Sequence, residues 1–122
     1  MLSHNEKIKS DFEGTILDIE TIEPFCWDYP HDDSRRYSKI IPIIIGYITK
    51  NELKILCAKG KNALDELKKE AIRLLPSMEK PLFAFQSIFE RAVFYHCYNF
   101  KLKIDGELNE IPMKGRELPV QN

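Results

Sequence analysis

The stretch GTILDIETIEPF, residues 14–25, places two acids at alternate positions of an otherwise apolar segment. Its β-branched residues, with Gly14 at the start, predict a strand over residues 14–22. Residues two apart in a strand point to the same face, so Asp18 and Glu20 would project side by side. Neighbouring carboxylates repel each other unless something screens them. The segment therefore predicts a strand with an acidic pair that needs an explanation.

Length and composition define the class of protein. The chain has 122 residues, of which 43% are hydrophobic and 30% charged. These values are typical of one globular domain, which we expect to span residues 1–122. Within it, residues 1–12 are expected to form a loose N-terminal arm and residues 105–122 an irregular tail. With a formal net charge of -1, the chain has no excess of basic residues of the kind typical of polyanion-binding domains. A nucleic acid would therefore have to be held by local patches.

The sequence also indicates the cellular compartment. No apolar run approaches the roughly 20 residues that span a bilayer, and the first residues contain no apolar core of a signal peptide. We therefore expect a cytoplasmic protein without a membrane partner. Cys26, Cys57 and Cys97 show no CxxC spacing, so they predict reduced thiols rather than a zinc site or a disulfide framework.

Two further strands and a helix are expected after the acidic segment. Apolar residues 39–49 and 52–60, joined by a short connection, predict an antiparallel hairpin in which Pro42 marks an edge, an end or a bulge. The apolar period then changes to 3.6 over residues 62–77, which predicts a helix with Asn62 as N-cap and Pro76 as stop signal. The residues expected to share its inward face are Leu64, Leu67, Ala71, Leu74 and Leu75.

The next segment predicts a buried strand followed by a second helix. Residues 80–86 are short and apolar, which is typical of a central strand, and the helix is expected to begin near Ser87. A helical crossover favours a parallel arrangement of this strand with the first strand or its neighbour. The fold class is therefore α/β with a mixed sheet. The second helix is expected to turn inward Phe89, Ala92, Val93, His96 and Cys97.

This order of elements and two of its motifs resemble the DEDD family of 3'-5' exonucleases, which has the ribonuclease H-like fold. The resemblance covers residues 14–100 and rests on the apolar-apolar-Asp-apolar-Glu-Thr pattern and on FAFQSIFERAVFY, residues 83–95. It implies that Asp18 and Glu20 form the first motif. Gln86 and Glu90 stand where the family usually has Asn and Asp. The third motif has no match after residue 100, and we expect the chain to end before a fifth strand and a last helix would fit.

The resemblance implies a two-metal hydrolysis of phosphodiester bonds at the 3' end of a single strand of DNA or RNA. Two Mg²⁺ or Mn²⁺ ions lie about 4 Å apart in such sites, where they activate water and steady the leaving oxygen. Asp18 would bridge both ions, Glu20 would bind one of them and hold the attacking water, and Glu90 would approach from the facing helix. Oxygen ligands of this kind are those that Mg²⁺ prefers.

Further residues are candidates for contact with the substrate. The resemblance implies that Gln86 contacts the substrate or the Asp18 region, and Thr21 and Phe89 belong to the same two motifs. The loop over residues 26–38 lies near the expected mouth of the site and carries charges and rings that suit phosphates and bases. These candidates are Arg35, Arg36 and the following Lys39 for phosphate, and Trp27, Tyr29 and Tyr37 for stacking. His31 lies nearer the expected mouth of the site, where it could form a metal cluster with Asp32 and Asp33.

Several of these residues have a structural alternative. Asp18 and Glu20 could be the solvated face of an edge strand, although the flanking isoleucines favour a buried central strand, where unpaired acids are unfavourable. Ser87 and Glu90 have the spacing of a capping box, with Ser87 as N-cap and Glu90 returning to the backbone. His96 could be a hydrogen-bonded core residue.

Two alternatives concern the protein as a whole. The missing third motif and the Glu at position 90 favour a non-catalytic relative that binds nucleic acid or a protein through the same cleft. A shortened sheet with an unpaired edge could also associate as a homodimer.

Overall fold

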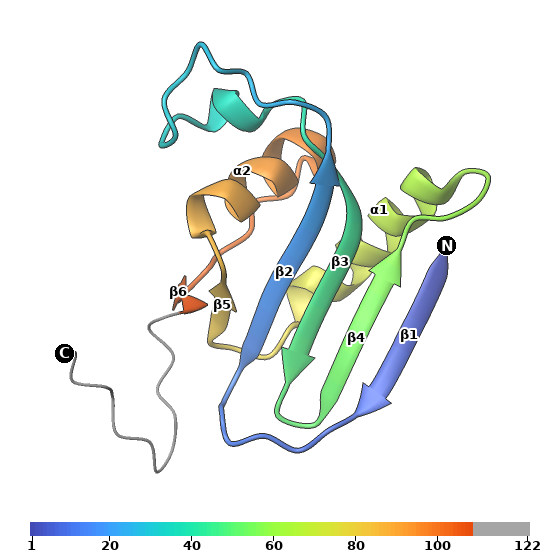
Figure 1. The fold of residues 1–122 in the computed structure, drawn as a ribbon. Helices are drawn as coiled ribbons and strands as arrows, with labels where there is room; N and C mark the ends of the chain where they lie inside the picture. Colours follow the sequence, from blue (N-terminus) through green and yellow to red (C-terminus); the bar gives the residue numbers. More distant parts are fainter. Residues whose placement is uncertain (109–122) are drawn as a thin grey trace, which may run out of the picture.

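A computed structural model describes residues 1–108, which form a six-stranded sheet with two helices (Figure 1). The strands are β1 (Leu2–Lys7), β2 (Thr15–Ile22), β3 (Ile41–Thr49), β4 (Glu52–Cys57), β5 (Leu82–Ala84) and β6 (Gly106–Glu107). The helices are α1 (Ala63–Leu74) and α2 (Ser87–Tyr98), with two short 3-10 helices, η1 (Ser34–Tyr37) and η2 (Leu75–Ser77). Neither helix is long and apolar enough to cross a membrane, as far as the described part of the chain shows.

The strand order is β1-β4-β3-β2-β5-β6, and it confirms the expected mixed α/β class. β3 pairs antiparallel with both β2 and β4, while β5 runs parallel to β2, as the helical crossover predicted. β5 lies between β2 and β6 and is buried throughout, so its predicted central position is confirmed. The register between β2 and β3 shifts after Glu20, opposite Pro42, where the missing N–H of proline favours a bulge.

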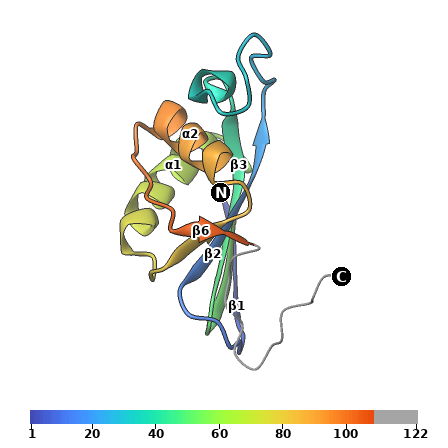
Figure 2. The same cartoon turned by 90° about the vertical axis from the view of Figure 1, so that its left-hand side faces the viewer.

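Both helices pack on the same side of the sheet (Figure 2), and the main core lies between these layers. β2 contributes Leu17 and Ile19 to it, and α1 contributes Leu67 and Ala71. The prediction that Leu64 points inward is wrong, because its side chain is 44% exposed. It sits in the first turn of α1, one residue after the buried Ala63, and the buried face of the helix follows Ala63, Leu67 and Ala71.

The opposite face of the sheet carries a smaller apolar cluster. Phe83 alternates with the core residues of β5 and therefore faces this side, where it packs against Phe12. Ile16 of β2 and Ile48 of β3 lie against the same pair. Within residues 1–108, no helix covers this face (Figure 2). Asp18 and Glu20 lie on this side too, because they alternate with Leu17 and Ile19.

The expectation of a loose N-terminal arm over residues 1–12 is wrong. Leu2–Lys7 form the edge strand β1, paired antiparallel with β4. All six of its side chains are exposed, so the segment has no apolar alternation from which a strand could be recognised. Backbone hydrogen bonds to β4 hold it instead, and its charged residues suit an edge.

We expected an irregular tail from residue 105 and no further strand after residues 80–86. For residues 105–108 this expectation is wrong. Gly106–Glu107 form β6, which pairs parallel with β5. Asp105 leads into β6: its backbone N–H donates to the Leu82 carbonyl, and its Oδ2 accepts from the Leu82 N–H, both at 2.7 Å. A strand of two residues has no period to read. The rest of the predicted tail, from residue 109, lies outside the described residues.

The start of β2 depends on Gly14. Gly14 has a φ of +98°, and a Cβ at this position would lie 2.0 Å from the Pro81 carbonyl oxygen. The backbone N–H of Thr15 donates to the Pro81 carbonyl at 3.0 Å, and its side-chain hydroxyl donates to the Glu79 carbonyl at 2.7 Å. The segments around Thr15 and Pro81 therefore cannot separate without losing these hydrogen bonds. Gly14 therefore permits this close approach.

We expect Gly14→Ala to lower the free energy of unfolding by more than about 3 kcal/mol, because steric overlap is added to the backbone strain. Gly60→Ala is the matched control: its φ is also +98°, but no atom lies within 4 Å of the added Cβ. It should lose only about 1–2 kcal/mol. Urea denaturation measures both values, and equal losses would contradict the close approach.

Candidate functional site

The acidic pair lies where β2 extends beyond its parallel neighbour. β5 pairs with Thr15, Ile16 and Leu17 and then ends, so the second half of β2 has no strand on this side. Asp18 Oδ1 accepts a hydrogen bond from the Ile19 N–H at 3.0 Å. The carboxylate thus satisfies a backbone donor that β5 does not reach.

Asp18 and Glu20 are both exposed. The prediction that they share a face is confirmed, and β2 is a central strand as expected. Their expected burial is wrong, because the pair points to the face that α1 and α2 do not cover. Solvent therefore screens the two charges, and their repulsion by itself does not require a cation.

Glu90 reaches the same place from α2. The chain leaves β5 at Ala84 and enters α2 at Ser87, so the first turn of the helix lies beside the second half of β2. A hollow of about 220 Å³ is formed there by Asp18, Glu20 and Glu90 with Gln86 and Phe89, together with Ile19 and Phe85. The structure thus brings together the three predicted carboxylates and two of the predicted substrate contacts.

The carboxylate of Glu90 also caps α2. Its Oε1 and Oε2 accept from the Gln86 N–H at 3.1 and 3.4 Å. The Glu90 side chain thus accepts from the backbone at the start of the helix, as predicted. The N-cap residue, however, is Gln86 and not Ser87. The N–H of Ser87 donates instead to Glu107 Oε2 at 2.5 Å, and this bond lowers the pKa of Glu107.

Glu90 is 1% exposed, and burial raises its pKa to about 7. The hydrogen bond from the Gln86 N–H acts in the opposite direction, and the charge of Asp18 adds to the increase. A carboxyl group with such a pKa exchanges its proton near neutral pH, which is typical of functional sites but also occurs in structural ones.

The site fits a divalent cation only in part. Its three donors are carboxylates, the ligand type that suits Mg²⁺ and Mn²⁺. Among residues 1–108, however, no three His, Cys, Asp or Glu side chains are grouped closely enough to hold a metal ion. Asp18 and Glu20 are exposed, and Asp18 accepts the Ile19 N–H, whereas Glu90 is buried and bonded to Gln86. A bound ion would require these side chains to converge.

A second hollow of about 420 Å³ adjoins the acidic one and shares Gln86 and Phe89 with it. Arg36 lines it, and among the buried side-chain atoms of the described residues its Nε has no hydrogen-bond partner. The Arg36 guanidinium lies 4.5 Å from the ring centre of Trp27, which is 69% exposed. The loop candidates Arg36 and Trp27 thus lie together, and Arg36 lines the hollow beside the acids. Their contacts with a phosphate and a base stay predictions.

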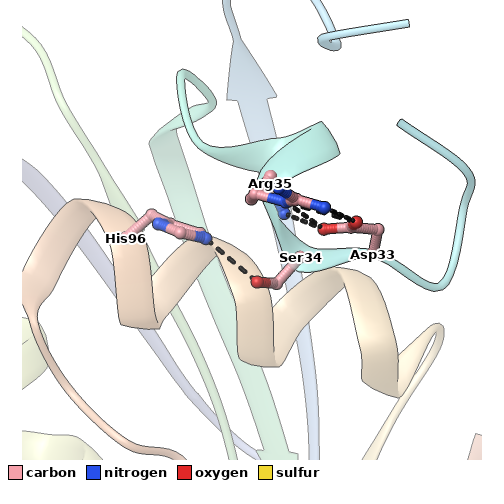
Figure 3. Close-up of polar contacts among 4 residues, drawn as sticks. All are labelled: Asp33, Ser34, Arg35 and His96. Carbon is pink, nitrogen blue, oxygen red and sulfur yellow. Dashed lines mark hydrogen bonds and ion pairs between the residues drawn. The ribbon is translucent and has the colours of Figure 1, made fainter. Parts of the chain in front are cut away.

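Other loop candidates stabilise the loop itself. Arg35 forms an ion pair with Asp33 at 2.6 Å (Figure 3). Its guanidinium also lies 4.4 Å from the ring centre of Tyr29. The hydrogen bonds from Arg35 lower the pKa of Asp33 to about 2. Tyr37 is 6% exposed and donates to the His31 carbonyl at 2.6 Å, so it is not available to stack on a base.

The loop is anchored to α2 through His96. His96 Nε2 and Ser34 Oγ lie 3.2 Å apart (Figure 3). His96 is hydrogen-bonded as expected, but it bridges two elements at the surface rather than lying in the core. Thr21 lies at the register shift between β2 and β3 and lines neither of the two hollows. Lys39 is exposed.

A third hollow, of about 320 Å³, lies on the other side of the acidic pair. It is mainly apolar and follows the uncovered face of β2, β3 and β4. Gly46 of β3 is paired with Asp18 across the ladder and forms part of its floor. The acidic pair thus stands between a polar hollow and an apolar one.

Comparisons of the chain with protein-family models, with curated proteins and with solved structures return no match. The site is therefore defined by the geometry of this chain alone.

The raised pKa of Glu90 predicts a stability that decreases with pH. Between about pH 4.5, its ordinary value, and pH 7, the folded protein retains a proton that the unfolded chain releases. The free energy of unfolding should therefore decrease across this window, by about 3 kcal/mol in total.

Glu90→Gln should remove this dependence, since the amide keeps an oxygen for the Gln86 N–H and has no proton to release. Glu79→Gln, an exposed acid elsewhere, is the matched control and should keep the wild-type slope. Urea denaturation at several pH values measures the effect. The same slope in Glu90→Gln as in the wild type would contradict the assignment.

Proposed function

We propose that this protein is a metal-dependent nuclease that removes nucleotides from the 3' end of a single strand of DNA or RNA. In this proposal Asp18 and Glu20 hold Mg²⁺ or Mn²⁺, and Glu90 joins them when an ion binds. The observation that carries the proposal is the single hollow beside the second half of β2 that these three carboxylates line.

The order of elements supports a ribonuclease H-like fold. β2, β3 and β4 follow one another as antiparallel strands, α1 then crosses to the parallel strand β5, and α2 follows. This is the order expected from the resemblance. β1 and β6 extend this sheet at its two edges without changing the order of its centre.

The chemistry of the site supports a role for metal. A divalent ion would lower the pKa of a bound water and supply a nucleophile for the phosphodiester. Asp18 and Glu20 are accessible enough to bind an ion together with substrate. Glu90 would lose its proton on binding, because a cation favours the charged form of a carboxyl group.

The substrate candidates lie next to these acids. Gln86 and Phe89 line both the acidic hollow and the neighbouring hollow that Arg36 lines. A terminal nucleotide could thus place its phosphate near the carboxylates and its base near the rings of the loop. The three cysteines are free, which suits a reducing cytoplasm.

Binding of Mn²⁺ should raise the melting temperature of the protein. At an ion concentration ten times the dissociation constant, the native state gains about 1.4 kcal/mol, which corresponds to an increase of about 5 °C for a chain of this length. Asp18→Asn should abolish the increase, whereas Asp28→Asn, an exposed acid outside the hollow, should keep it. A thermal-shift titration measures this, and an unchanged melting temperature in the wild type would argue against a metal site.

Hydrolysis should depend on the same carboxylates. With Mn²⁺ and a 5'-labelled single strand, the wild type should shorten the strand from its 3' end, and Asp18→Asn should be slower by about 100-fold or more. Asp28→Asn should retain full activity. Gel electrophoresis of the labelled products measures the rate. Equal activity in Asp18→Asn and the wild type would exclude this site as the source of the hydrolysis.

A second candidate function is a non-catalytic module that binds nucleic acid or a protein through the same cleft. It is favoured by the hydrogen bond that engages Glu90 as a cap and by the incomplete grouping of the three acids within residues 1–108. Binding of a single strand without any shortening in Mn²⁺ would support this candidate over the nuclease.

Association into a homodimer is a further proposal. β1 pairs with β4 on one side, and within residues 1–108 its other edge has no neighbouring strand. A second copy could extend the sheet there, although the charged side chains of β1 disfavour such pairing.

A further inference from the structure

Three hollows follow one another along α2. The acidic hollow shares Gln86 and Phe89 with the hollow of Arg36, and the hollow of Arg36 shares Ile88 with another one, of about 370 Å³. This last hollow lies between the loop around Ser34 and the outer face of α2. The shared residues show that the three hollows adjoin one another, and we call this row of hollows, from the acids to the outer face of α2, the track.

The middle of the track suits a nucleotide. Arg36 has a buried Nε without a partner among the described residues, so an anion that reached it would satisfy an unmet donor. Phe25 and Phe89 lie 6.1 Å apart between ring centres and give the same hollow an apolar wall. A cation beside aromatic rings is the combination that binds the backbone and bases of single strands.

The far end of the track has the same chemistry. Arg91 and Lys101 line it and are exposed, so both charges are accessible to a ligand. Tyr95 lies between them along the chain and is 52% exposed, so its ring is accessible for stacking on a base. Ile88, which is 40% exposed, joins this end to the middle of the track.

We propose that a single-stranded nucleic acid occupies this track, with its 3' end at Asp18 and Glu20 and its upstream nucleotides over Arg36 and then over Arg91, Tyr95 and Lys101. This inference rests on the proposed function and extends it, because it assigns the path of the strand beyond the reacting phosphate. None of the residues at the far end was indicated by the sequence.

Two acids also face the track, and both are compatible with the path. Glu107 lines the middle hollow, but its carboxylate accepts the Ser87 N–H and lies at the N-terminus of α2, where the helix dipole offsets its charge. Asp32 lines the far hollow together with Arg91 and Lys101, so the two cations outnumber the acid there. The strand therefore meets a net positive charge after it leaves the acidic hollow.

Binding of labelled oligothymidylates, followed by fluorescence anisotropy in EDTA, tests this path without hydrolysis. Affinity should rise with length and level off within roughly 4 to 8 nucleotides. Arg91→Gln and Lys101→Ala should each weaken binding of the longer strands about 3- to 10-fold and reduce the slope of log affinity against log salt by about 0.7, as expected for one lost phosphate contact. Tyr95→Ala should weaken binding roughly fivefold or more through lost stacking.

Lys69→Ala is the matched control, because it removes an exposed positive charge from α1, outside the three hollows. It should bind like the wild type. If Arg91→Gln and Lys101→Ala also bind like the wild type, the path is overturned, whether or not the protein hydrolyses a strand. If they weaken binding while no hydrolysis occurs in Mn²⁺, the path stands and the nuclease proposal fails. Equal affinity for an oligoglutamate of the same charge would overturn the path in favour of an acidic peptide.

Discussion

The candidate site depends on the unequal lengths of two parallel strands. β5 is only three residues long, so β2 continues for five residues with no strand on the side opposite β3. The chain uses this space to turn from β5 into α2, which brings Glu90 next to Asp18 and Glu20. A longer β5 would pair with the Ile19 backbone, displace the Asp18 carboxylate from its N–H and move the first turn of α2 away.

The pattern of apolar and β-branched runs separated by turn residues was enough to predict most of the sheet. It located β2, β3 and β4, and the change of period located α1 and α2. It could not show which face of β2 the helices cover. Successive residues of a strand point to opposite faces, and both the acidic and the apolar positions of β2 were expected to be buried. β1 and β6 were missed for a related reason: one has six exposed side chains and the other has two residues, so neither carries a period.

The site was predictable only where a motif is local in the chain. Asp18, Glu20 and Glu90 come from two short stretches, and the structure does bring them to one hollow. The contacts of Glu107 with Ser87 and of His96 with Ser34 join residues far apart in sequence, so no spacing could indicate them. Glu90 shows the limit of a motif, since the same residue fits a helix cap and a metal ligand. Its carboxylate contributes to the stability of α2 and remains available to a cation only by giving up that bond.

Gly46 gives the acidic pair room on its apolar side. A Cβ at this position would meet only ordinary van der Waals contacts, 3.7 Å from the Lys54 oxygen and 3.8 Å from a side-chain carbon of Ile55. The backbone therefore does not need a glycine here, and a larger residue would favour the strand. Its effect is to keep a space open beside Asp18. A single methyl group at this position would thus change the shape of the apolar hollow beside Asp18 without disturbing the sheet.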